Sequence, residues 1–367
     1  MTSKILITSV GSMVAQNILE TLKYRRQNLF IIGTDASADA PLYDCDKVFL
    51  VPDSELPPSD FSEKILQIIK SENPDVIIPG RDIDVIILGM LKSQNPELAH
   101  KFVVGNYEIA KIVEDKWASY LFSMETGLPF ADSILYDSKY DREAVGLFIK
   151  KHGFPLILKP RKGFASRSVS LIVNEGQLAN QDDVQGMILQ EYLGSPEVII
   201  DFTNDLIRKG TPLFYTLEDV KYSLQLFIDR SGGLKDSLVT LHKMKNGVSG
   251  RVDIHSNHGM DDIITLFHDV FAKKGWYGPL NVQFQKSNKT NELKAYEINA
   301  RYTGATAARY ILGYDEVGFA LSESGIKLAG ADPIFNSQKS VLKQTYISER
   351  PDHHIAALNR DGVWERK

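Results

Sequence analysis

Short apolar runs and segments of helical spacing alternate along the first part of the chain. The pattern predicts strands at 4–10, 30–37, 75–80 and 101–106, and helices at 14–27, 61–71 and 83–93. Strands that alternate with helices are typical of a parallel sheet that is covered by helices on both faces. We therefore expect residues 1–110 to form a doubly wound α/β domain.

The pattern changes after residue 110. A helix is expected over 111–130, followed by short runs rich in β-branched residues that predict antiparallel strands. These strands are expected at 154–160, 169–173, 187–193, 197–203, 213–229, 236–243, 278–285 and 293–301, with helices at 261–274 and 315–329. The second part is thus expected to be α+β, in segments 111–200 and 201–335, and the polar stretch 336–367 receives no assigned role.

The predicted strand 293–301 carries the most informative residues. Because alternate residues of a strand point to opposite faces, it presents an apolar set (Tyr296, Ile298, Ala300) and a polar set (Glu297, Asn299, Arg301). A hairpin turn centred near residue 290 would place Gln283 opposite Glu297. Carboxylate and amide oxygens suit a hard cation such as Mg²⁺, and a guanidinium suits a bidentate grip on phosphate or carboxylate. The alternative is a polar face exposed to solvent.

Three further features carry polar groups at the ends of predicted elements. Lys159 precedes a basic turn of small residues, whose amides can approach phosphate closely, although the turn lacks the GK[ST] ending of a Walker A loop. The segment around Glu191 offers the acceptors, backbone donors and apolar walls that an adenine pocket requires. Lys116 opens an amphipathic helix. Taken singly, these features also fit an exposed hairpin tip, an ordinary hairpin and a solvated lysine.

Composition narrows the range of functions. Hydrophobic residues make up 43% of the 367 residues and charged residues 24%, as in ordinary soluble enzymes. The formal net charge of -5 argues against a nucleic-acid partner, and no apolar run approaches the length of a membrane span. The single cysteine, Cys45, allows no internal disulfide or cysteine-rich zinc site, and its flanking aspartates disfavour a reactive thiolate. A cytoplasmic setting fits these features.

In this order, the four features resemble the ATP-grasp superfamily, most closely the branch of the carbamoyl phosphate synthetase large chain, biotin carboxylase and PylC-like ligases. The resemblance covers roughly residues 1–330, and its most specific part is the E-x-N-x-R string from Glu297 to Arg301 with Gln283 upstream. It implies an ATP-grasp fold after the doubly wound domain, with a phosphate-covering hairpin in 111–200 and a metal site in 201–335.

The resemblance also implies a role for each residue of the site. The residues that would contact ATP are Lys116 and Lys159 (phosphates), Arg301 (the transferred phosphate or the acyl phosphate), Glu191 with the backbone of Tyr192 and Leu193 (adenine), and Glu197 (ribose). The ligands of two Mg²⁺ ions, for which Mn²⁺ is an alternative, would be Gln283, Glu297 and Asn299.

One loop departs from the family's pattern. The phosphate-covering loop is usually of the form G-x-G-S-x-G, whereas residues 163–168 read Gly-Phe-Ala-Ser-Arg-Ser. Ala165 and Ser168 occupy positions where glycine is common. We therefore expect the loop to be stiffer, or to reach the phosphates through side chains such as that of Ser166.

The reaction implied by the resemblance joins two small molecules in two steps. A carboxylate attacks the γ-phosphate of ATP to give an acyl phosphate and ADP, and an amine then displaces phosphate. The residues expected to bind these substrates are Ser12 at a helix start, Asp82 for the amine, and Arg81 and Arg251 for carboxylates. Arg251 fits surface charge equally well. The expected partners are the two small substrates, and a homodimer is compatible with the resemblance.

Three other functions fit parts of the pattern. Residues 4–35 have the strand–turn–helix–strand order of a dinucleotide site, but their turn has one glycine where the oxidoreductase fingerprint has three. A non-catalytic nucleotide-binding protein, or one subunit of a split synthetase, would explain the glycine-poor loop. A kinase that releases its phosphorylated acceptor would use the same site. The ligase accounts for the complete set of lysines and oxygen ligands, and it is the function we predict.

Overall fold

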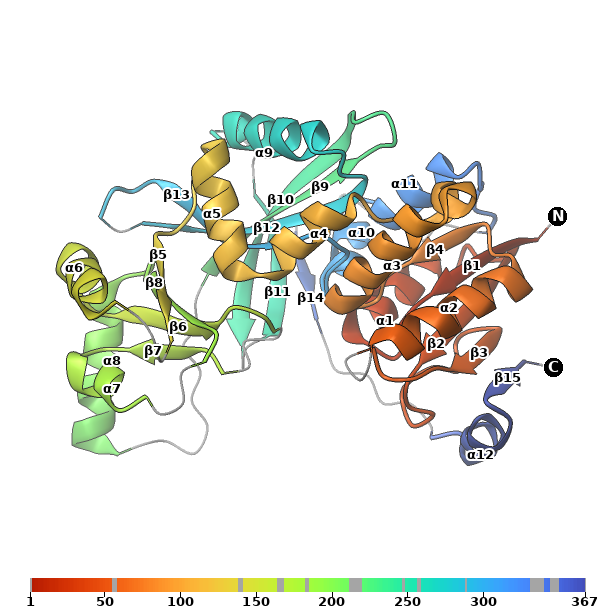
Figure 1. Cartoon of the computed structure of the whole chain (residues 1–367), viewed down its shortest axis with the longest axis horizontal. Coiled ribbons are helices and arrows are strands. Elements are labelled where there is room, and N and C mark those ends of the chain that lie inside the picture. Colours follow the sequence, from red (N-terminus) through yellow and green to blue (C-terminus); the bar gives the residue numbers. More distant parts are fainter. Residues whose placement is uncertain are drawn as a thin grey trace.

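The structure is a computed structural model, and it describes residues 2–54, 58–137, 141–163, 168–181, 185–210, 220–245, 248–255, 259–287, 289–330, 340–343 and 350–366. These residues form three sheets with helices packed around them (Figure 1). The first sheet lies at one end of the molecule, the largest lies in the middle and the smallest lies at the other end. The predicted combination of α/β and α+β regions is confirmed.

The first sheet contains three of the four predicted parallel strands and two strands that the sequence pattern missed. Its order is β15-β3-β2-β1-β4, with β1 (Ser3–Ile7), β2 (Leu29–Asp35), β3 (Lys47–Leu50) and β4 (Val76–Ile78) parallel and β15 (Val363–Glu365) antiparallel. Helix α1 (Met13–Leu22) packs on one face, and α2 (Pro58–Glu72) and α3 (Asp82–Gln94) pack on the other. The doubly wound arrangement follows from the alternation of strands and helices along this part of the chain.

The strand predicted at 101–106 is wrong. Residues Pro96–Lys101 form a 3-10 helix, and beyond them a single bridge joins Phe102 to Ile77. Phe102, Val103 and Val104 are nevertheless fully buried. The apolar run therefore reflects burial of an irregular segment, which hydrophobicity alone does not distinguish from a buried strand.

Two helices replace the single helix predicted over 111–130. Helix α4 (Tyr107–Glu114) ends and α5 (Lys116–Thr126) begins at Asp115, whose carboxylate accepts hydrogen bonds from the backbone N–H groups of Trp117 and Ala118. This side-chain cap satisfies donors that the start of a helix leaves without intrahelical partners. The cap places Lys116 at the first position of α5.

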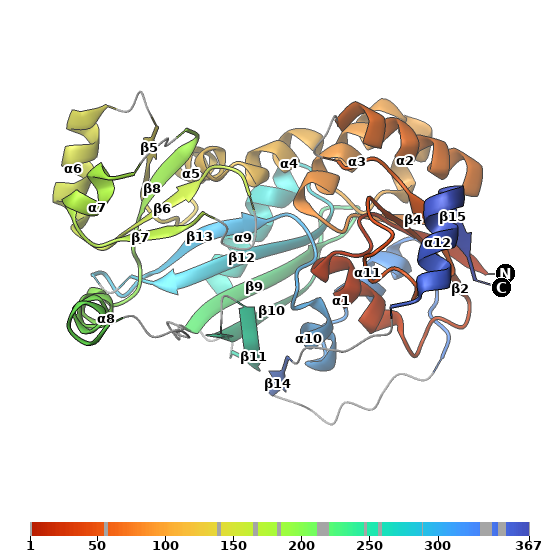
Figure 2. The same cartoon turned by 90° about the horizontal axis from the view of Figure 1, so that it is seen from below.

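The smallest sheet belongs to a subdomain with its own core. Its order is β5-β8-β6-β7, from β5 (Ser133–Tyr136), β6 (Leu156–Pro160), β7 (Ser170–Ile172) and β8 (Met187–Glu191). Helices α6 (Arg142–His152) and α7 (Glu175–Ala179) accompany it (Figures 1 and 2). Tyr136, Leu156 and Leu158 lie in a buried cluster that is separate from the cores of the other two sheets.

The strand predicted at 197–203 is also wrong, because Pro196–Lys209 form helix α8. The β-branched residues of this segment favour a strand by intrinsic propensity. Its ends, however, carry helix signals: Pro196 and Glu197 lie in the first turn, Arg208 and Lys209 in the last, and Gly210 follows.

The largest sheet contains the informative hairpin. Its order is β13-β12-β9-β10-β11-β14, and each neighbouring pair is antiparallel. Its strands are β9 (Val220–Ile228), β10 (Leu234–Lys245), β11 (Val248–Ile254), β12 (Gly278–Lys286), β13 (Leu293–Asn299) and β14 (Ser340–Leu342). The accompanying helices are α9 (Asp261–Lys273), α10 (Thr306–Ile311) and α11 (Glu316–Glu323). One apolar core runs from α2 and α3 through α4 and α5 to this sheet and α9, so the first domain and the largest sheet are packed together.

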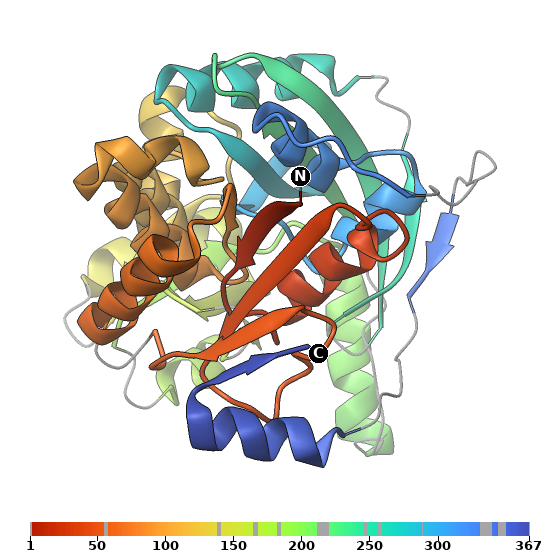
Figure 3. The ribbon, with the colours of Figure 1, turned by 90° about the vertical axis from the view of Figure 1, so that its right-hand side faces the viewer.

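The chain returns to the first domain through α12 (Asp352–Asp361) and β15 (Figure 3). Leu358 and Trp364 pack into the core of the first sheet, and β15 pairs with β3. This part of the 336–367 stretch therefore completes the first sheet at its edge. No helix in the described segments is long and apolar enough to cross a membrane.

Candidate active site

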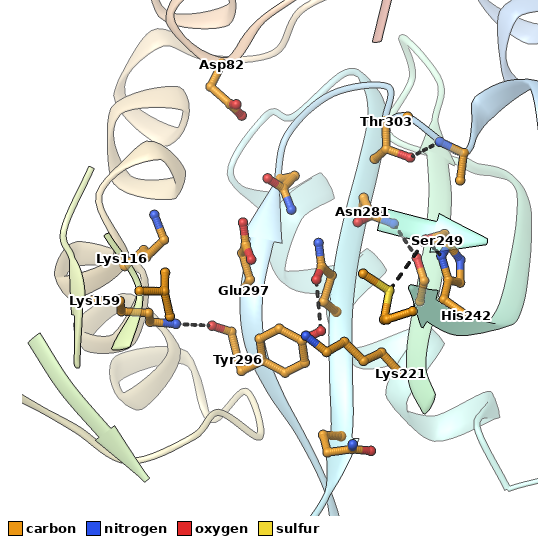
Figure 4. Close-up of a pocket in the computed structure, with 18 of the residues that line it drawn as sticks. Asp82, Lys116, Lys159, Lys221, His242, Ser249, Asn281, Tyr296, Glu297 and Thr303 are labelled. Atoms are coloured by element: carbon orange, nitrogen blue, oxygen red, sulfur yellow. Dashed lines mark hydrogen bonds between the residues drawn. The ribbon is translucent and has the colours of Figure 1, made fainter. Parts of the chain in front are cut away.

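A cavity of about 630 Å³ lies where the first domain, the small subdomain and the largest sheet meet (Figure 4). Its walls come from the start of α1, the turn after β4, strands β6 and β8, and strands β9, β12 and β13. Residues far apart in the sequence thereby face one another, as in most enzyme pockets.

The hairpin β12–β13 has the register that the sequence predicts. Gln283 lies opposite Glu297, and Asn281 lies opposite Asn299. All four side chains line the cavity. The polar set of the strand therefore faces this cavity and not the outer surface of the sheet.

The alternation along β13 predicts that Tyr296 lies on the apolar face of the strand. The structure does not place it there. Glu297 pairs with Gln283 and Ala295 pairs with Phe284, so Tyr296 is the extra residue of a β-bulge. Its side chain lines the cavity, and its hydroxyl donates a hydrogen bond to Gln283 Oε1 at 2.9 Å. A bulge reorients a side chain and locally disrupts the pairing of the strands, and a simple two-residue period cannot predict it.

The oxygen ligands on this hairpin fit a hard cation. The Glu297 carboxylate has no hydrogen-bond partner among the residues that the structure describes, although Lys159 and Arg301 interact with it electrostatically. The amide oxygens of Gln283 and Asn299 lie on the same wall. Within the described segments, no cluster of three His, Cys, Asp or Glu residues could hold a metal. A cation here would therefore need amide oxygens and ligand phosphates as well, as Mg²⁺ commonly does.

Two lysines approach Glu297 from the side of the small subdomain (Figure 4). Lys159 is buried, and its ammonium donates hydrogen bonds to Gln190 Oε1 at 2.8 Å and to the Tyr296 carbonyl at 3.0 Å. Burial lowers the pKa of Lys159 to about 7; Glu297 opposes the shift, and Lys116 and Lys221 add to it. Lys116 donates to the Gly163 carbonyl at 2.9 Å. Excess positive charge in a partly buried space suits an anionic ligand.

Glu191 is held in a buried cluster at the edge of the cavity. Its carboxylate accepts hydrogen bonds from the Asp132 backbone N–H and from Lys294, and it lies 3.5 Å from His152 Nδ1. Burial opposes ionisation, but the bonds from His152 and Lys294 outweigh it and lower the pKa of this carboxyl. Tyr192 and Leu193 follow β8 and line the cavity. The backbone after Glu191, with apolar side chains beside it, therefore faces the cavity.

One predicted nucleotide ligand, Glu197, is not brought into this arrangement, and another, Ser166, is not described. Glu197 lies exposed in the first turn of α8, where its carboxylate accepts a hydrogen bond from Ser195, and it is not among the residues that line the cavity. Ser166 lies outside the described residues, and so does most of the glycine-poor loop. Gly163, at the start of that loop, does line the cavity.

Arg301 and Asp82 are bonded to each other. Arg301 Nε and Nη2 donate to the two carboxylate oxygens of Asp82 at 2.6 and 2.7 Å, and Nη2 also donates to Asn299 Oδ1 at 3.2 Å. Asp82 begins α3 of the first domain, and Arg301 follows β13. This bidentate ion pair joins the residues that were predicted to meet phosphate and amine respectively.

The remaining predicted substrate residues divide into two groups. Ser12 caps α1, donates to the Gly80 carbonyl at 2.8 Å and lines the cavity. Arg81 also lines it and donates to the hydroxyls of Ser9 and Ser54. Arg251 is exposed, bonds to Asp253 at 2.7 Å and is not among the cavity residues. Its alternative interpretation as surface charge agrees with this position.

The cavity also has lining residues that the sequence analysis did not identify. Lys221 on β9 extends toward Tyr296, with its ammonium 5.5 Å from the ring centre (Figure 4). His242, Ser249 and Lys343 come from β10, β11 and the end of β14. Nothing local marks these residues, because only the pairing of strands that are distant in the sequence brings them to one wall.

Comparison with known proteins gives no match to a family model and none to a curated protein sequence. Solved structures do match. N5-carboxyaminoimidazole synthetase from Staphylococcus aureus, complexed with ADP, aligns with a TM-score of 0.66 at 15% identity, over 89% of this chain and 79% of that one. The chain has the ATP-grasp fold. The predicted fold is thereby confirmed.

Two further ATP-grasp structures are similar over most of this chain. The biotin carboxylase domain of 2-oxoglutarate carboxylase from Hydrogenobacter thermophilus, in complex with MgADP, ADP and bicarbonate, aligns with a TM-score of 0.63 at 15% identity, over 89% of this chain and 70% of that one. Biotin carboxylase from Campylobacter jejuni aligns with a TM-score of 0.61 at 15% identity, over 92% and 74% respectively. At these identities the ATP-grasp fold is shared, and function has to be argued from the site.

Proposed function

We propose that the protein is an ATP- and Mg²⁺-dependent ligase that activates a carboxylate as an acyl phosphate and condenses it with an amine. The observation that carries this proposal is the meeting of Lys116 and Lys159 with Glu297 and Asn299 across one cavity. Cations on one wall and oxygen ligands on the other are what a metal–polyphosphate requires.

The nucleotide would lie along the wall formed by the small subdomain. Ile157, Val169 and Leu193 supply apolar surface for a base, and the backbone after Glu191 supplies polar groups. The phosphates would then extend toward Lys116 and Lys159. The structurally similar synthetase and carboxylase are complexed with ADP and with MgADP, which supports a nucleotide as the ligand of this fold.

Glu297, Asn299 and Gln283 would hold Mg²⁺ in this arrangement. The bound ion would neutralise charge on the phosphate oxygens during transfer. The protein contributes positioning and a fixed electrostatic environment, and it requires no nucleophile of its own. Cys45 agrees with this, because burial raises the pKa of its thiol to about 12.

The Arg301–Asp82 pair lies where the two substrates would react. An incoming ammonium would attract Asp82, and that would free the Arg301 guanidinium to hold the activated carboxylate or the released phosphate. An amine must lose its charge before it can attack, and Asp82 is the nearest described carboxylate to Arg301 that the metal set does not use. Asp82 would thus orient the amine and Arg301 the acid.

The proposal is tested by measuring ADP and phosphate release with MgATP across a panel of carboxylic acids and amines. We expect release that requires one acid and one amine together and that falls at least about 10³-fold in Glu297→Gln, since oriented charge stabilisation supplies most of such rate enhancement. Glu292→Gln, at an exposed position in the turn of the same hairpin, is the control and should keep full activity.

Two other outcomes would redirect the interpretation. A stable phosphorylated acid that needs no amine would identify a kinase. Tight ATP binding without turnover across the whole panel would favour a non-catalytic or split-synthetase subunit. Release that is equally fast in Glu297→Gln would contradict the proposed metal site.

A further inference from the structure

The cavity has an end that the proposed nucleotide and metal sites leave unexplained. It lies beyond Asn281, on the side away from Lys116 and Lys159, where His242, Ser249 and Thr303 are drawn in Figure 4. The start of α1 and the loop after β13 lie next to each other at this end, since Met13 lies close to Gly304 and both line the cavity. An additional part of a substrate would fit this space.

Lys343 supplies the positive charge at this end. Its neighbour Leu342 is 68% exposed, whereas Lys343 lines the cavity and donates a hydrogen bond to the Gly304 carbonyl. Burial lowers the pKa of the Lys343 ammonium, and the nearby Arg309 lowers it further. In the described part of the chain, no carboxylate forms an ion pair with Lys343. The carboxylates that line the cavity are Asp82, Glu191 and Glu297, and none of them bonds to it.

The other polar side chains that line this end, His242, Ser249 and Thr303, are neutral, and the Arg309 guanidinium lies behind Thr303. The His242 ring nitrogens lie 2.9 Å from Thr240 Oγ1 and 2.7 Å from Ser249 Oγ. Burial, together with Arg309 and Lys343, lowers the pKa of His242 to about 3, so the ring is uncharged at neutral pH. Thr303 Oγ1 accepts hydrogen bonds from Ala305 and Arg309, and no described group accepts the proton of its own hydroxyl.

We propose that this end of the cavity binds a second anionic group of the acid substrate, with Lys343 as its counter-ion and Thr303 as a neutral donor. The inference rests on the proposed ligase function, in which the first carboxylate is activated beside Arg301. The Lys343 ammonium is partly removed from water, and its described partner is the neutral Gly304 carbonyl, so a bound anion would supply the opposite charge that the described residues do not provide. The acid substrate would therefore be a dianion, such as a dicarboxylate or a phosphorylated acid.

Binding of matched acids tests the inference directly. We would use calorimetry with MgADP present to compare succinate, glutarate and adipate with butanoate, pentanoate and hexanoate, and to compare each with the phosphonocarboxylate of equal chain length. A charge-assisted contact predicts about 10- to 100-fold tighter binding of the best dianion than of its monoanion. A preference for the phosphonate or for the second carboxylate identifies which anion the site prefers.

Variants of Lys343 assign the preference to this residue. Lys343→Met and Lys343→Gln should reduce the preference for the dianion over its matched monoanion to within about twofold, while Lys343→Arg keeps this preference. Lys243→Met, an exposed lysine on β10 that does not line the cavity, is the control and should leave it unchanged. Unchanged MgADP affinity in all four variants verifies that the fold is intact.

The inference is overturned if the wild type binds no dianion more tightly than its matched monoanion, or if the preference survives in both neutral variants. Failure of the ligase proposal gives a different result. With hydroxylamine as the amine, the active enzyme should convert acids to hydroxamates in an ATP-dependent reaction. Absence of hydroxamate from every acid would reject the ligase, whereas hydroxamate formed equally from monoanions and dianions would reject only the role of Lys343.

Discussion

At the scale of single residues, Lys159 shows how a buried charge makes ligand binding depend on pH. Its ammonium is fully buried beside two other lysines, and its pKa is about 7. Below this pH the free protein holds the ammonium that phosphate needs, and above it the ammonium loses its proton. A bound phosphate raises the pKa again, so binding takes up a proton over this range.

We therefore expect the affinity for MgADP to fall as pH rises from 7 to 9, by up to about tenfold per pH unit. Calorimetry or a fluorescent nucleotide would measure it. Lys159→Arg is the control, because a guanidinium stays charged and the slope should disappear. An equal slope in both proteins would show that another group, or the nucleotide itself, is responsible.

The residues of the site differ in how far the sequence could predict them. The alternation along 295–301 placed Glu297 and Asn299 on one face, because neighbours on one strand need only local geometry. That this face is a site and not a solvent-exposed surface was implied only by the resemblance. The assignment of Glu197 assumed a strand after β8, and α8 carries that residue to an exposed turn. Lys221 and Lys343 could not be predicted, because each reaches the cavity through pairing with strands distant in the sequence.

At the scale of elements, a charged cluster connects the small subdomain to the hairpin β12–β13. Lys294 on β13 bonds to Glu191 on β8, and His152 at the end of α6 lies between Glu191 and Asp132, 3.1 Å from the latter. The segment of Tyr192 and Leu193 follows directly after Glu191. The cluster therefore positions the wall on which a base would lie.

Lys294→Met should lower the free energy of unfolding by roughly 1–3 kcal/mol, because it leaves the buried Glu191 carboxylate with one partner fewer. Urea unfolding measures the change. Lys286→Met, an exposed lysine on β12 of the same hairpin, should change stability by less than about 0.5 kcal/mol. Equal effects in the two variants would mean that the bond to Glu191 contributes nothing.

Helix α8 and the bulge at Tyr296 are the elements that show the limits of pattern reading. Helix α8 stands where the β-branched residues favour a strand, and the signals at its ends mark it as a helix. The bulge interrupts the two-residue period of β13 by a single inserted residue. The helix could have been predicted from Pro196, the basic last turn and Gly210. The bulge has no comparable local signal.

At the scale of the whole molecule, the return of α12 and β15 to the first sheet joins segments that are far apart in the sequence. β15 covers the edge of β3, and Ile355, Leu358 and Trp364 bury apolar surface in the core of that sheet. None of the residues that line the cavity comes from α12 or β15. Stability and ligand binding are thus expected to be separable here.

Removing residues from 350 onward should lower the melting temperature by about 5 °C or more and expose apolar surface, because several buried side chains are lost. The affinity for MgATP at 20 °C should change by less than about threefold, since the cavity remains complete. Differential scanning fluorimetry and calorimetry measure the two effects. An unchanged melting temperature would show that the returning segment does not stabilise the first domain.

The same pairing has a consequence for how the protein is made. β3 ends at Leu50, and its partner β15 begins at Val363. At roughly 5–20 residues per second, a ribosome needs about 15–60 s to synthesise the chain between them. For most of that time the edge of β3 has no β15 to pair with, although the rest of its sheet, which is complete once β4 has been made, has emerged. The first sheet is therefore among the last parts of this chain to be completed, and until then the edge of β3 stays open to pairing with other strands.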